Sequence, residues 1–144
     1  MIYTNSDGGA LGNPGPGAIG VLVRNDGKIL TQYSSKIGDF VTNNIAEYEG
    51  LIKALELARE HTDDELTCVL DSQLVVKQLL GEYAVKDRKL LELFLKVQKL
   101  QDNFKKITYV HVSRWDRFQQ LADGLLKEEL KRKNTLKNLG FQSA

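Results

Sequence analysis

Three segments near the start of the chain alternate hydrophobic residues with polar or small ones, which predicts short strands. They are residues 2–4, 18–24 and 28–36. Asp7 and a glycine-rich turn over residues 8–17 separate the first two segments, and the turn at residues 25–27 joins the last two as a hairpin. The chain is therefore expected to open with three antiparallel strands.

The hydrophobic period then lengthens to three or four residues, which predicts a helix that begins near Ile45. Its apolar face comprises Tyr48, Leu51, Ile52, Leu55 and Ala58. The preceding residues 42–44 are Thr-Asn-Asn, whose side chains suit a helix N-cap. An apolar run of strand length follows at residues 65–70.

The second half of the chain alternates helices and strands. We expect helices at residues 72–80, 87–102 and 118–133, and a strand at residues 107–112. The apolar side of the helix at 87–102 is expected to comprise Leu90, Leu91, Phe94, Leu95 and Gln98. The order β-β-β-α-β-α-α-β-α predicts an α/β fold with a five-stranded mixed sheet flanked by helices. Strands 1–3 would be antiparallel, with strands 4 and 5 parallel to strand 1.

A length of 144 residues suits one domain, expected at residues 1–133, with a C-terminal tail at 134–144 where the periodicity is weak. The single cysteine, Cys68, excludes an internal disulfide. No N-terminal targeting segment is visible, and no apolar run approaches the ~18 residues of a membrane helix. A cytoplasmic monomer without membrane contact is the expectation.

Charge is divided unevenly along the chain although the net charge is only +1. Residues 1–72 hold 5 Lys or Arg and 11 Asp or Glu, whereas residues 73–144 hold 15 and 8. A metal-dependent nuclease would have such a pattern, with acidic groups around the metals and basic groups around the phosphates. A solvated lysine-rich helical surface would explain the basic half equally well.

Four acidic residues lie where the predicted elements could bring them together: Asp7, Glu47, Asp71 and Asp123. Asp7 and Asp71 each follow a strand, and neighbouring strands are about 4.8 Å apart. Carboxylates that converge repel one another unless cations lie between them. Oxygen ligands suit Mg²⁺, and two such ions about 3.5–4 Å apart can clamp a phosphodiester for attack by water.

Each of these carboxylates also has a structural interpretation. Asp7 could form a turn before the two glycines. Glu47 stands three residues after Asn44, the spacing of a capping box, and Asp71 could cap the helix that it precedes. Asp123 could be one more exposed acid on a helix.

Four local motifs nevertheless resemble type 1 ribonucleases H. They are the DGGALGNPGPG run from Asp7, the TNN-x-x-E helix start at 42–47, the DSQLVV segment from Asp71, and the Leu-Ala-Asp at 121–123. They occur in the family's order over about residues 1–130. The resemblance implies an RNase H-like fold and a nuclease that cuts the RNA strand of RNA–DNA hybrids, leaving 5′-phosphate and 3′-hydroxyl ends.

The resemblance also implies the functional residues. Asp7, Glu47, Asp71 and Asp123 would be catalytic and would hold two Mg²⁺ ions, with Mn²⁺ as an alternative. Contacts to the 2′-hydroxyls of the RNA would come from Gly12, Asn13, Asn43, Asn44, Ser72 and Gln73. Thr42 would help to hold a DNA phosphate. The 2′-hydroxyl is the group that distinguishes RNA from DNA, although helix capping and turn formation would also explain these side chains.

The sequence departs from the family pattern at several places. The loop at residues 113–118 lacks a histidine found in some bacterial members, and Arg114 or Arg117 could take its place. His111 lies within a strand, which favours a structural role, and Gln119 stands where many members have Asn. Trp115 is expected to be half-exposed and packed on the adjacent helix, with base stacking as the alternative.

The basic handle that some members insert between helices is also missing. Hybrid binding would then depend on other basic residues: Lys86, Arg88 and Lys89. Three other functions remain open: a nuclease that also cuts double-stranded RNA, a hybrid-binding module without nuclease activity, and a detached part of a reverse transcriptase. The presence of all four carboxylates argues against the binding module.

Overall fold

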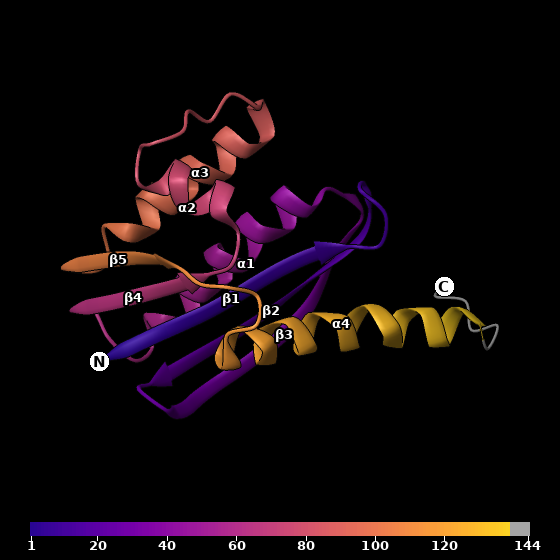
Figure 1. Cartoon of the computed structure of the whole chain (residues 1–144), viewed down its shortest axis with the longest axis horizontal. Helices are drawn as coiled ribbons and strands as arrows, with labels where there is room; N and C mark the ends of the chain where they lie inside the picture. The colour runs from indigo at the N-terminus through magenta and orange to yellow at the C-terminus, as the bar shows by residue number, and fades with distance from the viewer. Residues whose placement is uncertain (139–144) are drawn as a thin grey trace.

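Within residues 1–138, which a computed structural model describes, with side chains through residue 132, the chain forms one five-stranded sheet (Figure 1). Its strands are β1 (Ile2–Ala10), β2 (Gly15–Asn25), β3 (Lys28–Val41), β4 (Glu65–Leu70) and β5 (Lys106–His111). They lie in the order β3-β2-β1-β4-β5. β1, β2 and β3 are antiparallel, while β4 is parallel to β1 and β5 is parallel to β4. The predicted mixed sheet is confirmed.

The first three strands are longer than expected, and Asp7 lies inside β1 instead of after it. Gly8 and Gly9 were expected in a turn, but they pair with Ile19 and Ala18 of β2. The β1–β4 pairing ends earlier, with Asn5 opposite Val69. β1 therefore continues beside β2 after β4 has ended, and Asp7 lies just past the point where the two parallel strands separate.

Four helices cover the sheet among the described residues: α1 (Asn43–Ala58), α2 (Gln73–Leu79), α3 (Arg88–Gln101) and α4 (Arg117–Asn138). Figure 1 shows α1 behind the sheet and α4 in front of it, with α2 and α3 above α1 in this view. α4 projects past the end of the sheet and continues beyond the expected end at residue 133. The remainder of the expected tail, residues 139–144, lies outside the described residues, and the division into a 1–133 domain and a tail stays a prediction.

The larger hydrophobic core lies between the sheet and the α1–α3 layer. Tyr48, Leu51 and Leu55 of α1 are buried there, as the helical period predicts. On α3 the buried residues are Leu90, Leu93 and Val97, whereas Leu91 and Leu95 are exposed. The expected apolar face of this helix was therefore partly wrong, because α1 covers only one narrow stripe of it. None of the described helices combines the length and apolar character that crossing a membrane requires.

Candidate active site

Three of the predicted carboxylates form one cluster at the end of the sheet. Asp7 comes from β1, Glu47 from α1, and Asp71 directly follows β4. One carboxylate oxygen from each lies within 4.8 Å of the others. The parallel β1–β4 register explains this, because Asp7 and Asp71 each stand two residues beyond the paired Asn5 and Val69.

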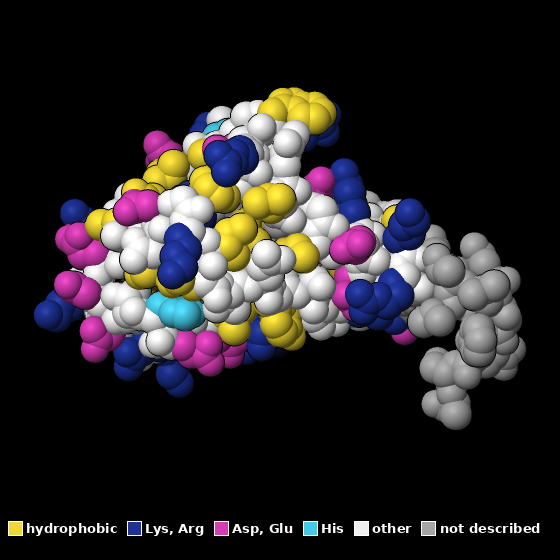
Figure 2. Space-filling view, turned by 90° about the horizontal axis from the view of Figure 1, so that it is seen from below, with side chains coloured by type: hydrophobic (Ala, Val, Ile, Leu, Met, Phe, Trp, Pro, Cys, Tyr) yellow, Lys and Arg dark blue, Asp and Glu magenta, His cyan; other side chains and the backbone are white. Residues whose placement is uncertain are grey.

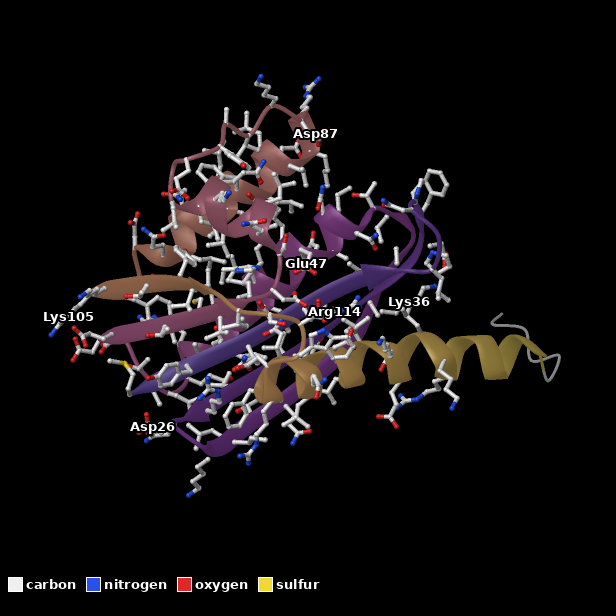
Figure 3. All side chains as sticks on the ribbon, viewed as in Figure 1. Asp26, Lys36, Glu47, Asp87, Lys105 and Arg114 are labelled. Carbon is white, nitrogen blue, oxygen red and sulfur yellow. The ribbon has the colours of Figure 1, made fainter. Side chains whose placement is uncertain are left out.

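Close packing of α1 onto β1 positions Glu47. A Cβ atom at Gly8 would lie 2.1 Å from the Ala46 carbonyl oxygen and 2.6 Å from the Glu47 amide nitrogen. A Cβ at Gly50 would lie 3.0 Å from the carbonyl oxygen of Asp7. Glycine at these positions lets the helix backbone approach the strand backbone directly. Glu47 consequently projects from α1 toward β1 (Figure 3).

The capping interpretations of Glu47 and Asp71 are wrong. The N-cap of α1 is Thr42, whose side chain accepts a hydrogen bond from the Ile45 amide at 3.2 Å. Ser72 caps α2 by accepting from the Val75 amide at 3.3 Å. Neither carboxylate is therefore needed to complete a helix terminus.

Burial of the cluster disfavours the charged forms of its acids. Burial raises the pKa of Asp7 to about 7, and the charges of Asp71 and Asp123 add to the rise, while its interaction with Glu47 opposes it. The pKa of Glu47 is held well above its usual value by burial and then by Asp7. Burial also raises the pKa of Asp71, against the opposing effects of Gln119 and His111. Ionising these buried carboxylates together is therefore unfavourable, and a bound cation would stabilise their charged forms.

These raised pKa values predict that the metal-free protein loses stability as the pH rises. Asp7 binds its proton more tightly in the folded protein than in the unfolded chain. Its contribution to stability is therefore complete below pH 3.8 and is lost as the pH rises through about 7. Thermal denaturation in EDTA across this range measures the loss. Asp7→Asn should flatten the dependence and Mg²⁺ should oppose it. A melting temperature with the same pH dependence in both proteins would contradict the expectation.

The donor set fits a divalent metal ion. Oε2 of Glu47 is buried without a hydrogen-bond partner, although it lies in a cluster of carboxylates. A buried acceptor without a partner is costly, and hard cations such as Mg²⁺ bind through carboxylate oxygens. Asp7, Glu47 and Asp71 are thus the residues that could hold a metal ion.

Asp123 borders this cluster without being part of it. Its charge raises the pKa of both Asp7 and Asp71, which places it nearby. Its Oδ2 accepts from Lys127 Nζ at 2.8 Å. α4 can bring Asp123 to the site because a Cβ at Gly20, the residue opposite Asp7 in β2, would lie 2.0 Å from the Ala122 carbonyl oxygen.

Gln119 anchors α4 to the sheet beside the cluster. Its Nε2 donates to the Ser6 carbonyl oxygen at 2.7 Å, and its Oε1 accepts from Asn5 Nδ2 at 3.2 Å. Asn5 Oδ1 in turn accepts from Arg24 Nε at 2.8 Å. Arg24 lies between the rings of Tyr3 and Phe118. The sequence raised doubt about Gln119, yet it is fully buried and well supported.

Sequence reasoning did not single out Asn5, because it stands in a run of polar residues from Thr4 to Asp7 and no local pattern distinguishes it from its neighbours.

The residues expected to contact RNA are divided between two places near the cluster. Asn13 and Asn43 connect the 11–14 turn to α1, since the Asn43 amide donates to Asn13 Oδ1 and the Ala10 amide donates to Asn43 Oδ1. Gly12 in this turn has a positive φ of 79°. Thr42 and Asn44 flank Asn43. Ser72 and the exposed Gln73 lie at the start of α2, directly after Asp71.

In the loop between β5 and α4, Trp115 is more exposed than the sequence predicted. Trp115 is 68% exposed, and the Arg114 guanidinium lies 4.7 Å from its ring centre, so the prediction of packing on a helix was wrong. His111, expected to be structural, is exposed at the end of β5, where its charge lowers the pKa of Asp71. Arg114 faces the site region in Figure 3, and its charge lowers the pKa of Lys127.

Comparison with known proteins agrees with this arrangement. Residues 5–127 match the family model described as reverse transcriptase-like. The crystal structure of RNase H1 from the archaeon Halobacterium salinarum aligns with a TM-score of 0.84 and 36% identity, over 91% of this chain and 98% of that one. The chain belongs to the type 1 ribonuclease H family. Its described fold is therefore the RNase H fold.

Two further ribonuclease H structures are similar to the chain. The N-terminal RNase H domain of a Mycobacterium tuberculosis protein has a TM-score of 0.86 and 34% identity, over 93% of this chain and 96% of that one. LC11-RNase H1 in complex with an RNA/DNA hybrid has a TM-score of 0.85 and 36% identity, over 92% and 99%.

The chain spans only part of its curated ribonuclease H relatives. It covers 64% of a ribonuclease HI from Halobacterium salinarum, with 39% identity over 130 residues. It covers 31% of a bifunctional protein from Mycobacterium tuberculosis, with 38% identity over 115 residues.

Proposed function

We propose that the protein hydrolyses the RNA strand of RNA–DNA hybrids as a metal-dependent endonuclease. The observation that carries the proposal is the cluster of Asp7, Glu47 and Asp71, with a buried Glu47 oxygen that lacks a partner. Family membership and the hybrid bound by the similar LC11-RNase H1 support this substrate. The four carboxylates argue against a binding module without activity.

The chain's own residues supply the charge and the rigidity that this reaction needs. Asp7, Glu47 and Asp71 would hold Mg²⁺, or Mn²⁺ in its place, and Asp123 would join them as the fourth carboxylate. Two bound ions would activate the attacking water and stabilise the leaving 3′ oxygen, leaving 5′-phosphate and 3′-hydroxyl ends. Gln119 holds α4 against the sheet, because it donates a hydrogen bond to the Ser6 carbonyl oxygen of β1. Its interaction with Asp71 also favours the charged form of that carboxylate.

Selection of RNA would depend on amides and backbone groups beside the cluster. Asn13 and Asn43 are held in place by each other and by β1, and Ser72 and Gln73 follow Asp71. Amide groups can both donate to and accept from a 2′-hydroxyl. The glycine at position 12 would let the protein backbone approach the RNA strand closely. Thr42 would lie near a DNA phosphate.

The hybrid would be held by basic and aromatic residues around the site. Arg114 and Trp115 form a cation–π pair on the loop that follows β5. Lys86 lies in the connection between α2 and α3, and Arg88 and Lys89 begin α3. Arginine and lysine bind phosphates, while an exposed tryptophan offers a stacking surface. Monomeric state, a cytoplasmic location and action on double-stranded RNA stay predictions.

A gel assay with four duplexes tests the proposal: an RNA–DNA hybrid, double-stranded RNA, double-stranded DNA, and the hybrid with its RNA strand replaced by DNA except at one residue. The hybrid should be cut with Mg²⁺ or Mn²⁺ and left intact in EDTA, and double-stranded DNA should not be cut. Equal cutting of DNA would refute selection by the 2′-hydroxyl, and cutting in EDTA would refute the metal requirement. Binding without cleavage of any duplex would favour the binding module.

A further inference from the structure

Lys127 occupies the carboxylate of Asp123 at the border of the acidic cluster. Its Nζ lies 2.8 Å from Asp123 Oδ2, one helical turn earlier on α4. The hydrogen bond and charge of Asp123, and then the charge of Asp7, raise the pKa of Lys127. The ammonium group is thus within the electrostatic influence of both acids.

The other three carboxylates have no such partner. Among the described residues, no Lys or Arg lies within ion-pair distance of Asp7, Glu47 or Asp71. Oε2 of Glu47 is buried without a hydrogen bond, whereas Oδ2 of Asp123 is paired with Lys127 and the Asp123 carboxylate also interacts with Asp7. The site is therefore divided into a cluster that needs a cation and a fourth acid that already has one.

The ion pair between Lys127 and Asp123 is exposed enough for either side chain to exchange its partner. The side chain of Lys127 is 72% exposed and that of Asp123 is 36% exposed. Exposed ion pairs contribute little to stability, and a lysine ammonium on a flexible stem reaches a phosphate as readily as a carboxylate. Figure 2 shows that the outer part of α4 carries Lys and Arg side chains together with Asp and Glu side chains.

We propose that Lys127 is an internal counter-ion for Asp123 that keeps a second divalent ion out of the site until the hybrid binds. Asp7, Glu47 and Asp71 would take one ion in the free protein. A phosphate of the hybrid would then draw Lys127 away, and Asp123 would become a ligand. Because coupling between two ligands is reciprocal, the hybrid and the second ion would each strengthen the binding of the other. The inference depends on the proposed metal site and adds its regulation.

Mn²⁺ binding to the hybrid-free protein tests this directly, with free Mn²⁺ counted by electron paramagnetic resonance. The wild-type protein should bind one ion tightly and a second ion only weakly. Lys127→Met should bind that second ion about threefold to tenfold more tightly. Lys127→Arg, which retains the charge, should behave as the wild type. Lys131→Met, which removes another exposed lysine from α4, is the matched control and should also behave as the wild type.

The Mg²⁺ dependence of hybrid cleavage gives a second measurement. Half-maximal turnover should occur at a lower Mg²⁺ concentration in Lys127→Met, by a similar factor. Equal Mn²⁺ stoichiometry and affinity in the wild type and Lys127→Met would overturn the inference, and cleavage by both proteins would show that the proposed function survives it. Absence of cleavage by the wild type, despite Mn²⁺ binding that responds to Lys127, would overturn the proposed function instead.

Discussion

Replacing Asp7 by asparagine is expected to lower hybrid cleavage by at least about a thousandfold while hybrid binding stays measurable. Asp7 lies at the centre of the site, since it is close to Glu47 and Asp71 and is influenced by the charge of Asp123. Asparagine has nearly the same shape but removes the charge that a metal ion needs. Single-turnover cleavage with Mg²⁺ and equilibrium binding to the same hybrid measure the two effects separately.

A matched substitution distinguishes loss of the site from general loss of charge. Asp64→Asn makes the same chemical change at an exposed residue just before β4, at the opposite end of that strand from Asp71. This variant should cleave as the wild type does. Near-normal turnover of Asp7→Asn in Mg²⁺ would remove the mechanism, whatever the control shows.

The second large effect is expected for Gly8→Ala. The new Cβ would lie 2.1 Å from the carbonyl oxygen of Ala46, so α1 must move away from β1. Overpacking against backbone should cost about 3 kcal/mol in the free energy of unfolding, or roughly 10 °C in melting temperature. Movement of α1 also carries Glu47 away from Asp7, so the folded variant should cleave more slowly and bind Mn²⁺ more weakly.

Gly27→Ala provides the comparison for this substitution. A Cβ at Gly27, in the turn between β2 and β3, would meet nothing within 4 Å. Thermal denaturation should show little change there, which would assign the effect at Gly8 to contact with α1. A wild-type melting temperature for Gly8→Ala would mean that the close approach of helix and strand does not limit the fold.

The sequence predicted the succession of strands and helices along the chain, because each element has a local signal in its hydrophobic period and in the turns that bound it. The relative directions of the strands follow from that succession. It also placed Asp7, Glu47 and Asp71 together, since parallel strands bring their carboxyl ends to one edge. It misjudged Gly8 and Gly9, because a glycine that admits a helix backbone has the same local signature as a glycine in a turn. That distinction depends on α1, which follows more than 30 residues later.

Other features depend on contacts between distant residues and could not be predicted from local patterns. The bond between Gln119 and Asn5 spans 114 positions. The exposure of Trp115 depends on how the loop after β5 turns, with the Trp115 amide donating to Ser113 Oγ and the Asp116 side chain accepting from the first turn of α4. The four-residue spacing of Asp123 and Lys127 on a helix predicts their ion pair. The sequence does not show, however, that this pair lies beside Asp7.

The anchoring of α4 by Gln119 has a consequence for how the proposed activity could be lost. Three carboxylates belong to the sheet and α1, whereas the fourth is carried by a helix on the opposite face that is fastened near its first turn. Local opening of that helix would leave the trio able to capture an ion but deprive it of Asp123. In the proposed reaction, capture of the metal and completion of the chemistry would therefore be separable events, governed by two different parts of the chain.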